Sequence, residues 1–176
     1  MRHILILMIS FMCTCCAYDG HEDIFLDPCV CVEDPRKLFG IDKDFIEFVE
    51  TFEMLAEQEV TDLPIHYGKE SEFKVNKDGS HTIGFCRGWR NVLNGTLYKE
   101  VRIKRSWWEQ ASYDSREFLI LHELGHCFLD REHNENFIEM NGEIIPESIM
   151  YPLEFGWQYY YGYYKEYYFE ELVNAR

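Results

Sequence analysis

The segment that decides the fold runs from Phe118 to His126 and reads F-L-I-L-H-E-L-G-H. Its apolar residues recur at helical spacing, and Ser112 or Asp114 upstream can serve as the N-cap. We therefore predict a helix that starts after one of these caps and runs to about Leu129. The apolar residues that precede His122 indicate that this helix is mostly buried.

The pattern H-E-x-x-H inside this helix combines metal-binding side chains with a carboxylate. His122 and His126 are four residues apart, so both imidazoles point to the same face of the helix. Zinc favours neutral imidazole nitrogen, and a catalytic zinc site keeps one position for water. Glu123 is predicted to take a proton from that water as general base, so that hydroxide attacks a peptide carbonyl. The motif therefore predicts a zinc metallopeptidase.

A third zinc ligand is expected beyond the end of the helix. We favour His133, because a third imidazole suits zinc and Asp130 tolerates the left-handed turn that would return the chain to the metal. Glu132, one residue earlier, is the next candidate. A carboxylate from a later segment is the remaining alternative, and the candidates are Glu143, Glu147 and Glu154.

The segment from His126 to His133 resembles the extended signature of metzincin zinc metallopeptidases, in which a glycine turn brings back a third histidine. Two positions depart from that signature: Leu129 stands where metzincins have glycine, and His133 comes one residue late. Downstream, Ser148-Ile149-Met150 is similar to the methionine-containing turn that metzincins place beneath the metal, with Met150 as its methionine. The resemblance implies an α+β zincin fold of a small bacterial envelope type.

The rest of the chain predicts a small mixed or antiparallel sheet packed on the metal helix, with one helix before it and one after it. The resemblance to metzincins extends from about Thr82 to the C-terminus. Helices are expected over residues 44–59, where Asp44 and Glu47 form a capping-box-like start, and over residues 162–173. The other expected elements are strands at residues 63–67 and from Val101 to Trp107-Trp108, a hairpin at 74–85 turning at Asp78-Gly79, and a loop at 88–95.

The N-terminus is predicted to be an export signal. Arg2 precedes an apolar block within Met1–Met12 that is too short to span a bilayer. Cleavage before Cys16 would leave an acylated cysteine, as in bacterial lipoproteins, whereas cleavage after Ala17 would release a free protein. We therefore expect a secreted or cell-envelope protein composed of a leader (1–17), a linker or cover segment (18–40) and a metallopeptidase domain (41–176).

Export would place four cysteines outside the leader in an oxidising compartment, which is enough for two disulfides. Cys29 and Cys31 would form a strained ring if they paired with each other, so each is expected to have a distant partner or to stay free. Cys127 follows His126 by one position and points off the metal face, so we expect it to pack or to pair with Cys86. Connectivity beyond that stays open.

The acidic composition restricts the partners. The 176 residues include 17 Lys and Arg against 32 Asp and Glu, a formal charge of −15. This balance disfavours nucleic acid and anionic membrane surfaces, so membrane attachment is expected through the N-terminal lipid anchor alone. We expect a monomer that binds a peptide or protein substrate. The alternative function is a non-catalytic envelope protein that keeps zinc for stability or for binding a partner.

Overall fold

A small mixed sheet lies at the base of the fold. The computed structural model describes residues 40–75, 79, 81–152 and 157–174. Strand β1 (Ile65–Gly68) pairs in parallel with β3 (Leu97–Lys104), and β3 pairs antiparallel with β2 (Gly84–Arg90). The strand order is β1-β3-β2, so β2 is an edge strand whose second side has no strand partner among the described residues. This arrangement agrees with the predicted α+β class.

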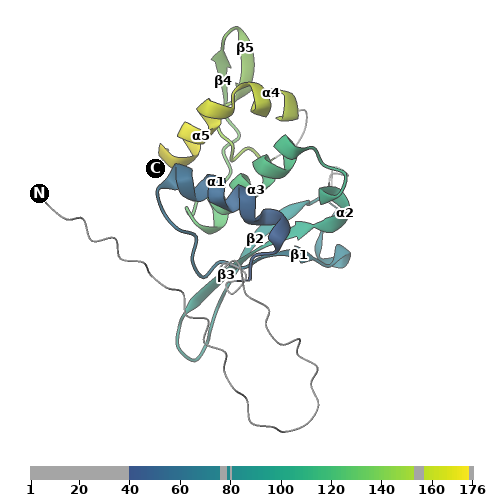
Figure 1. The fold of residues 1–176 in the computed structure, drawn as a ribbon, viewed down its shortest axis with the longest axis vertical. Helices are drawn as coiled ribbons and strands as arrows, with labels where there is room; N and C mark the ends of the chain where they lie inside the picture. Colours follow the sequence, from purple (N-terminus) through teal and green to yellow (C-terminus); the bar gives the residue numbers. More distant parts are fainter. Residues whose placement is uncertain (1–39, 76–78, 80, 153–156, 175–176) are drawn as a thin grey trace, which may run out of the picture. The chain divides into compact units, whose positions relative to one another are not determined.

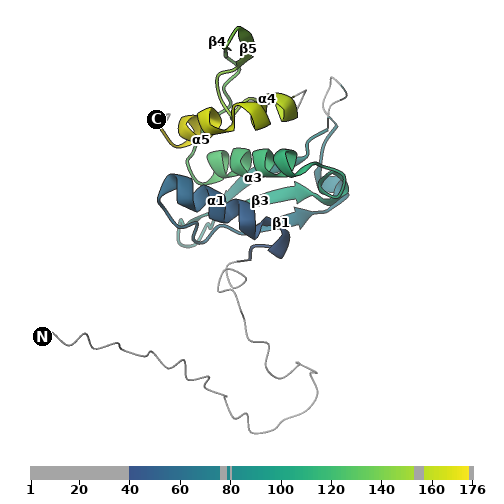
Figure 2. The same ribbon diagram turned by 45° about the horizontal axis from the view of Figure 1, so that its top comes forward.

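Helices cover one face of this sheet (Figures 1 and 2). The central helix, α3, contacts β2 and β3, and α1 packs beside it. The last two helices lie on the side of α3 that faces away from the sheet (Figure 2). The helices are η2 (Lys43–Phe45), α1 (Ile46–Ala56), η3 (Glu70–Glu72), α2 (Arg105–Trp108), α3 (Tyr113–Cys127), α4 (Trp157–Tyr163) and α5 (Lys165–Asn174).

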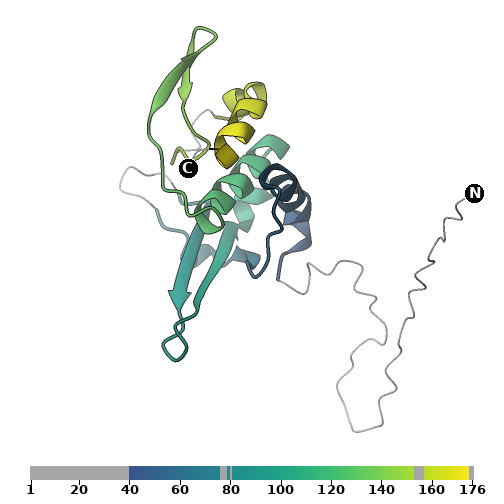
Figure 3. The ribbon, with the colours of Figure 1, turned by 90° about the vertical axis from the view of Figure 1, so that its left-hand side faces the viewer.

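Two hairpins point towards opposite ends of the described domain (Figures 1 and 3). One is formed by β2 and β3. The other is formed by β4 (Phe137–Met140) and β5 (Glu143–Pro146), which pair antiparallel as a separate two-stranded sheet. None of the helices within the described residues has the length and apolar character needed to cross a membrane.

Apolar side chains hold α1 against α3 and the sheet. Phe48, Val49 and Phe52 of α1 are buried, as their helical spacing predicts. The ring of Trp108 meets Phe48 edge-on at 5.6 Å between centroids, and it meets Phe45 at 4.8 Å. Burying each side chain of this size contributes about 1.5–3 kcal/mol, so this cluster fixes the position of α1 relative to the layer that carries α3.

The metal-helix prediction is confirmed in its position and in its cap. Ser112 is the N-cap of α3, because its hydroxyl accepts the backbone N–H of Ser115 at 3.2 Å. Asp114, the alternative cap, instead lies in the first turn. The helix ends at Cys127, and Asp130 then adopts the predicted left-handed conformation with φ +55°.

Several predicted element boundaries are wrong. The expected loop at residues 88–95 starts as strand, because Gly88 and Arg90 continue β2 and pair with β3. The pair Trp107-Trp108, expected to end a strand, lies in α2, with Trp108 turned into the core. The expected C-terminal helix is divided at Tyr164 into α4 and α5.

The beginning of α1 also differs from the prediction. Asp44 does not cap α1, because its carboxylate accepts the hydroxyl of Tyr67 at 2.8 Å and the helix starts at Ile46. The hairpin predicted over residues 74–85 agrees with an antiparallel bridge between Val75 and His81 and with the hydrogen bond from the N–H of Thr82 to the carbonyl of Lys74 at 3.0 Å. The predicted leader and nearly all of the cover segment, with Cys29, Cys31, Asp78 and Glu154, lie outside the described residues.

Candidate metal centre

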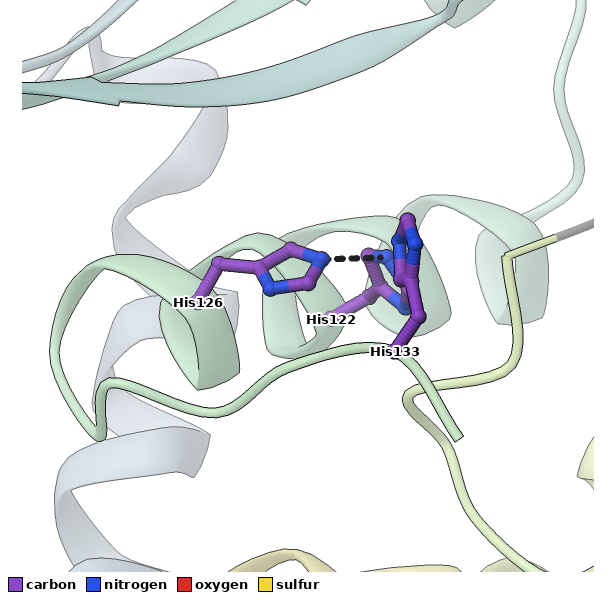
Figure 4. A group of neighbouring side chains, drawn as sticks. All are labelled: His122, His126 and His133. Carbon is purple, nitrogen blue, oxygen red and sulfur yellow. Dashed lines mark hydrogen bonds between the residues drawn. The ribbon is translucent and has the colours of Figure 1, made fainter. Parts of the chain in front are cut away.

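Helix α3 and the loop after it bring three histidines together (Figure 4). His122 and His126 project from one face of α3, and His133 comes from the returning loop. One ligand-capable atom of each ring lies within 4.8 Å of the other two. Within the described part of the chain, this is the sole group of three or more His, Cys, Asp or Glu residues with such spacing.

The returning loop is held in place by backbone hydrogen bonds. The N–H of Arg131 donates to the carbonyl of Gly125 at 3.0 Å, and the N–H of Asn134 donates to the carbonyl of Met150 at 3.1 Å. These bonds, together with the left-handed Asp130, accommodate the longer turn that brings His133 back to the helix. His133 comes one residue later than the third histidine of the metzincin signature, but it still reaches His122 and His126.

The carboxylates considered as third ligands are not part of the cluster. Glu132 is exposed and lies outside the histidine group. Glu147 accepts hydrogen bonds from the side chains of Asn134 and Asn136, at 3.1 and 3.0 Å. Glu143 accepts the hydroxyl of Tyr164 at 3.1 Å. Of the described candidates, His133 is therefore the one that joins His122 and His126.

Backbone carbonyls fix the tautomers of the two helix histidines. His122 donates its Nδ1–H to the carbonyl of Ile149 at 2.8 Å, and His126 donates its Nδ1–H to the carbonyl of Arg131 at 2.6 Å. A carbonyl can only accept, so in each neutral ring the proton lies on Nδ1 and the lone pair lies on Nε2. Such a bond behind the ring is the usual arrangement for a metal-binding histidine.

The two Nε2 atoms face each other at 3.1 Å (Figure 4). With both Nδ1 atoms protonated, two lone pairs would meet there without a proton between them. A cation would satisfy both nitrogens at once. Two imidazole ligands of a tetrahedral zinc ion lie about 3.3 Å apart, given Zn–N distances near 2.05 Å. The donor set and the spacing of this pair therefore fit a zinc ion.

Burial keeps the deepest histidine neutral. His122 is buried, and the loss of water around its ring lowers its pKa to about 3, against the opposing effect of the hydrogen bond to Ile149. Burial also lowers the pKa of His133, although its side chain reaches the surface. A neutral ring keeps its Nε2 lone pair for a metal, and the exposed His133 leaves the cluster open to solvent on one side.

Glu123 lies on the sheet side of α3 with one oxygen unsatisfied. The residue is 4% exposed, and its carboxylate accepts the backbone N–H of Cys86 in β2. Burial raises its pKa to about 8 despite that hydrogen bond. Its Oε2 is buried and has no hydrogen-bond partner among the described residues. This oxygen is therefore a buried polar atom whose hydrogen-bonding capacity the described residues leave unused.

A disulfide joins the helix that carries Glu123 to the strand that its carboxylate contacts. Cys86 of β2 is bonded to Cys127 at the end of α3, as the sequence suggested, with their Cα atoms 5.4 Å apart. The bond closes a loop across 41 residues of sequence. By the chain-entropy model, a loop of this length stabilises the folded state by about 4 kcal/mol. The edge strand is thus fixed covalently to the helix that carries the histidines.

Gly84 leaves the space that the Glu123 carboxylate occupies. A Cβ at Gly84 would lie 2.8 Å from Oε1 of Glu123 and 2.9 Å from Cδ1 of Leu119. We therefore expect Gly84→Ala to displace the carboxylate and to destabilise the fold by about 1–3 kcal/mol.

Gly88 provides the matched control on the same strand. Its nearest Cβ contact would be 3.4 Å, so Gly88→Ala should retain wild-type stability within about 0.5 kcal/mol. Urea unfolding of both variants gives the readout. Equal stability of the two variants would contradict the role assigned to this space.

Met150 lies directly beneath the histidine-bearing turn of α3. Its side chain is fully buried, and a Cβ at Gly125 would lie 2.4 Å from its Sδ atom. Gly125 therefore permits the close approach of the helix to the methionine turn. The hydroxyl of Ser148 accepts the N–H of Met150 at 2.9 Å and fixes that turn. The predicted methionine thus packs against the backbone of α3 at Gly125.

One carboxylate, that of Glu171 in α5, connects both segments that orient the helix histidines. It forms an ion pair with Arg131, whose carbonyl accepts from His126. Its other oxygen accepts the N–H of Ile149 at 3.1 Å, and the carbonyl of Ile149 accepts from His122. Arg131 also donates to the hydroxyl of Ser148 at 3.2 Å. Sequence reasoning did not find Glu171 or Arg131, because they lie 40 residues apart and belong to no motif.

Replacing Glu171 with glutamine should therefore weaken metal binding. We expect Glu171→Gln to lower zinc affinity about 10–100-fold, the usual range for groups that orient metal ligands. Glu170→Gln, on an exposed neighbour, should leave the affinity unchanged. Competition with a zinc-binding dye measures the affinity, and thermal unfolding without metal measures stability separately. If stability falls while zinc affinity is unchanged, Glu171 stabilises the fold without orienting the histidines.

Comparisons with known proteins do not identify relatives of this chain: no protein-family model, no curated protein and no solved structure matches it.

Proposed function

We propose that this chain is a zinc-dependent endopeptidase in which His122, His126 and His133 bind zinc and Glu123 is the general base. The observation that carries the proposal is the convergence of three imidazoles, two of which are held with their Nε2 lone pairs facing one another. A purely structural pair of histidines would gain nothing from that orientation.

The donor set favours zinc over harder cations. Magnesium and calcium prefer oxygen ligands, whereas imidazole suits zinc and its neighbours in the first transition row. No carboxylate of the described residues belongs to the cluster. Three protein ligands with one side open to solvent are typical of catalytic zinc sites, because a structural zinc usually has four protein ligands.

The residues of this chain would divide the hydrolysis between them. When bound, zinc lowers the pKa of water and polarises the scissile carbonyl. The positive charge of a bound zinc would lower the raised pKa of Glu123, so that its ionised Oε2 accepts the proton of the attacking water and then transfers it to the leaving amine. The N–H of Cys86 holds the carboxylate in place during both transfers.

The edge of β2 is the proposed position for the substrate. Ile83 accepts the N–H of Lys104 from β3, so in an antiparallel ladder the backbone groups of Gly84, Cys86 and Gly88 point to the other side. The N–H of Cys86 that reaches Glu123 agrees with this alternation. An extended peptide could add to this edge as a further strand, which brings its backbone past Glu123.

We also propose that the protein acts outside the cytosol, as a secreted or cell-envelope protein. The disulfide between Cys86 and Cys127 supports this location, because disulfides persist in oxidising compartments and are rare in the cytosol.

The test combines metal analysis with a cleavage assay on the full chain. We expect one zinc per chain and cleavage of a denatured protein or a peptide library. A chelator should abolish cleavage, and added zinc should restore it. Stoichiometric zinc without cleavage of any substrate would overturn the peptidase proposal and favour the non-catalytic zinc-binding alternative.

A further inference from the structure

The tip of the β2–β3 hairpin exposes an unusual concentration of apolar side chains. Val92 and Leu93 are 95% and 93% exposed. Five of the eleven exposed large hydrophobic residues among those described lie between Trp89 and Tyr98. Figures 1 and 3 show this end of the hairpin projecting beyond the helical layer. Exposed apolar groups gathered at one projecting site mark an interaction surface.

An aromatic pair lies behind this tip, next to the pair formed by Arg90 and Leu97. Trp89 and Tyr98 are opposite each other in the register of β2 and β3, and their rings stack at 5.9 Å between centroids. Both rings remain exposed. Trp and Tyr have an apolar body and a polar end, which is why they are enriched where hydrocarbon meets water in membranes.

The charge of this hairpin differs from that of the chain. Residues 84–99 contain three cations and no Asp or Glu, although the whole chain has 32 acidic residues. Arg87 and Lys99 are paired with Glu100 and Asp130. The guanidinium of Arg90 donates to the carbonyl of Gly95 at 2.8 Å and has no carboxylate partner among the described residues. One uncompensated cation therefore lies beside the aromatic pair.

We propose that this tip inserts into the interface of a phospholipid bilayer that contains anionic lipid. From the tip backwards, the aliphatic side chains of Val92 and Leu93 come first, Arg90 and Leu97 follow, and the aromatic pair lies behind them. Exposed aliphatic side chains at a projecting tip, backed by Trp, Tyr and a cation, are typical of a segment that lies in the membrane interface. Residues 84–99 contain no Asp or Glu, so the acidic charge of the chain lies outside this stretch, where its effect is screened beyond about 10 Å at 0.1 M salt.

The β4–β5 hairpin also exposes an apolar side chain but lacks the charge pattern of the β2–β3 tip. It exposes Ile144 to 71%, but Glu139 and Glu143 lie on the same hairpin and would be repelled by anionic headgroups. Ile144 therefore supplies a matched control for substitutions at the tip of β2–β3.

The first measurement is sedimentation of the full chain with vesicles of 70% phosphatidylcholine and 30% phosphatidylglycerol. We expect the double variant Val92→Asp with Leu93→Asp to bind at least tenfold more weakly than the wild type. Ile144→Asp should bind within twofold of the wild type. Arg90→Gln should bind about fivefold more weakly to these vesicles and normally to pure phosphatidylcholine. Equal binding of the double variant and Ile144→Asp, or no binding by the wild type, would overturn the proposal.

The second measurement separates the hairpin from any contribution of the N-terminal segment. Brominated phosphatidylcholine quenches tryptophan that enters the bilayer. We expect quenching of the wild type, and loss of most of that quenching in Trp89→Phe. Undiminished quenching in Trp89→Phe would overturn the proposal. The proposal would also be overturned if gel filtration showed that the hairpin mediates self-association while brominated lipid did not quench the wild type. Neither measurement depends on zinc, so failure here leaves the peptidase proposal unaffected.

Discussion

Replacing Glu123 with glutamine is expected to lower the rate of peptide cleavage by about 10²–10⁴-fold while the protein keeps one zinc per chain. The amide matches the carboxylate in shape, and its oxygen can still accept the N–H of Cys86. It cannot take a proton from the attacking water, because its other terminal group is a donor. Cleavage of an unfolded protein substrate and metal analysis of the same sample give both values.

Glu132→Gln is the control for this variant. Glu132 is exposed and lies outside the histidine cluster, so its substitution should change cleavage by less than twofold. If Glu123→Gln retains full activity, Glu123 is not the base. If it loses zinc together with activity, the carboxylate supports the metal site instead of the proton transfer.

The second large effect is expected at His133. His133→Ala should lower zinc affinity by at least 100-fold, which exceeds the range of about 10–100-fold for groups behind the ligands. The physical reason is the loss of one of three donors, which leaves Nε2 of His122 and His126 as the remaining protein ligands. Equilibrium dialysis against buffered zinc measures the change.

Glu132→Ala provides the matched comparison next to His133. The two residues are adjacent in the returning loop, so both substitutions disturb the same backbone, but one removes a member of the cluster. We expect Glu132→Ala to bind zinc within twofold of the wild type. The opposite order of the two variants would transfer the third ligand position to Glu132.

The parts of the site that depend on local periodicity could be predicted from the sequence. The spacing of His122 and His126 fixes them on one helix face, and Asp130 indicated the left-handed turn that returns His133. The buried face of α1 could also be predicted, because Phe48 and Phe52 recur at helical spacing and both are buried in the core.

The parts that depend on tertiary contacts could not be predicted. Nothing near Arg131 or Glu171 in the sequence indicates that they meet, because the contact joins residues 40 apart. Gly88 favours a loop locally, but pairing with β3 keeps it in a strand. Trp108 turns into the core because the rings of Phe45 and Phe48 pack against it, and these residues belong to η2 and α1, far from Trp108 in the sequence.

The connection of Glu171 to both histidine-orienting carbonyls has a consequence for how the protein matures. During synthesis, the residues of α3 are made well before those of α5, so a growing chain contains His122 and His126 before the carboxylate that fixes their tautomers. Tight metal uptake should therefore begin when α5 docks.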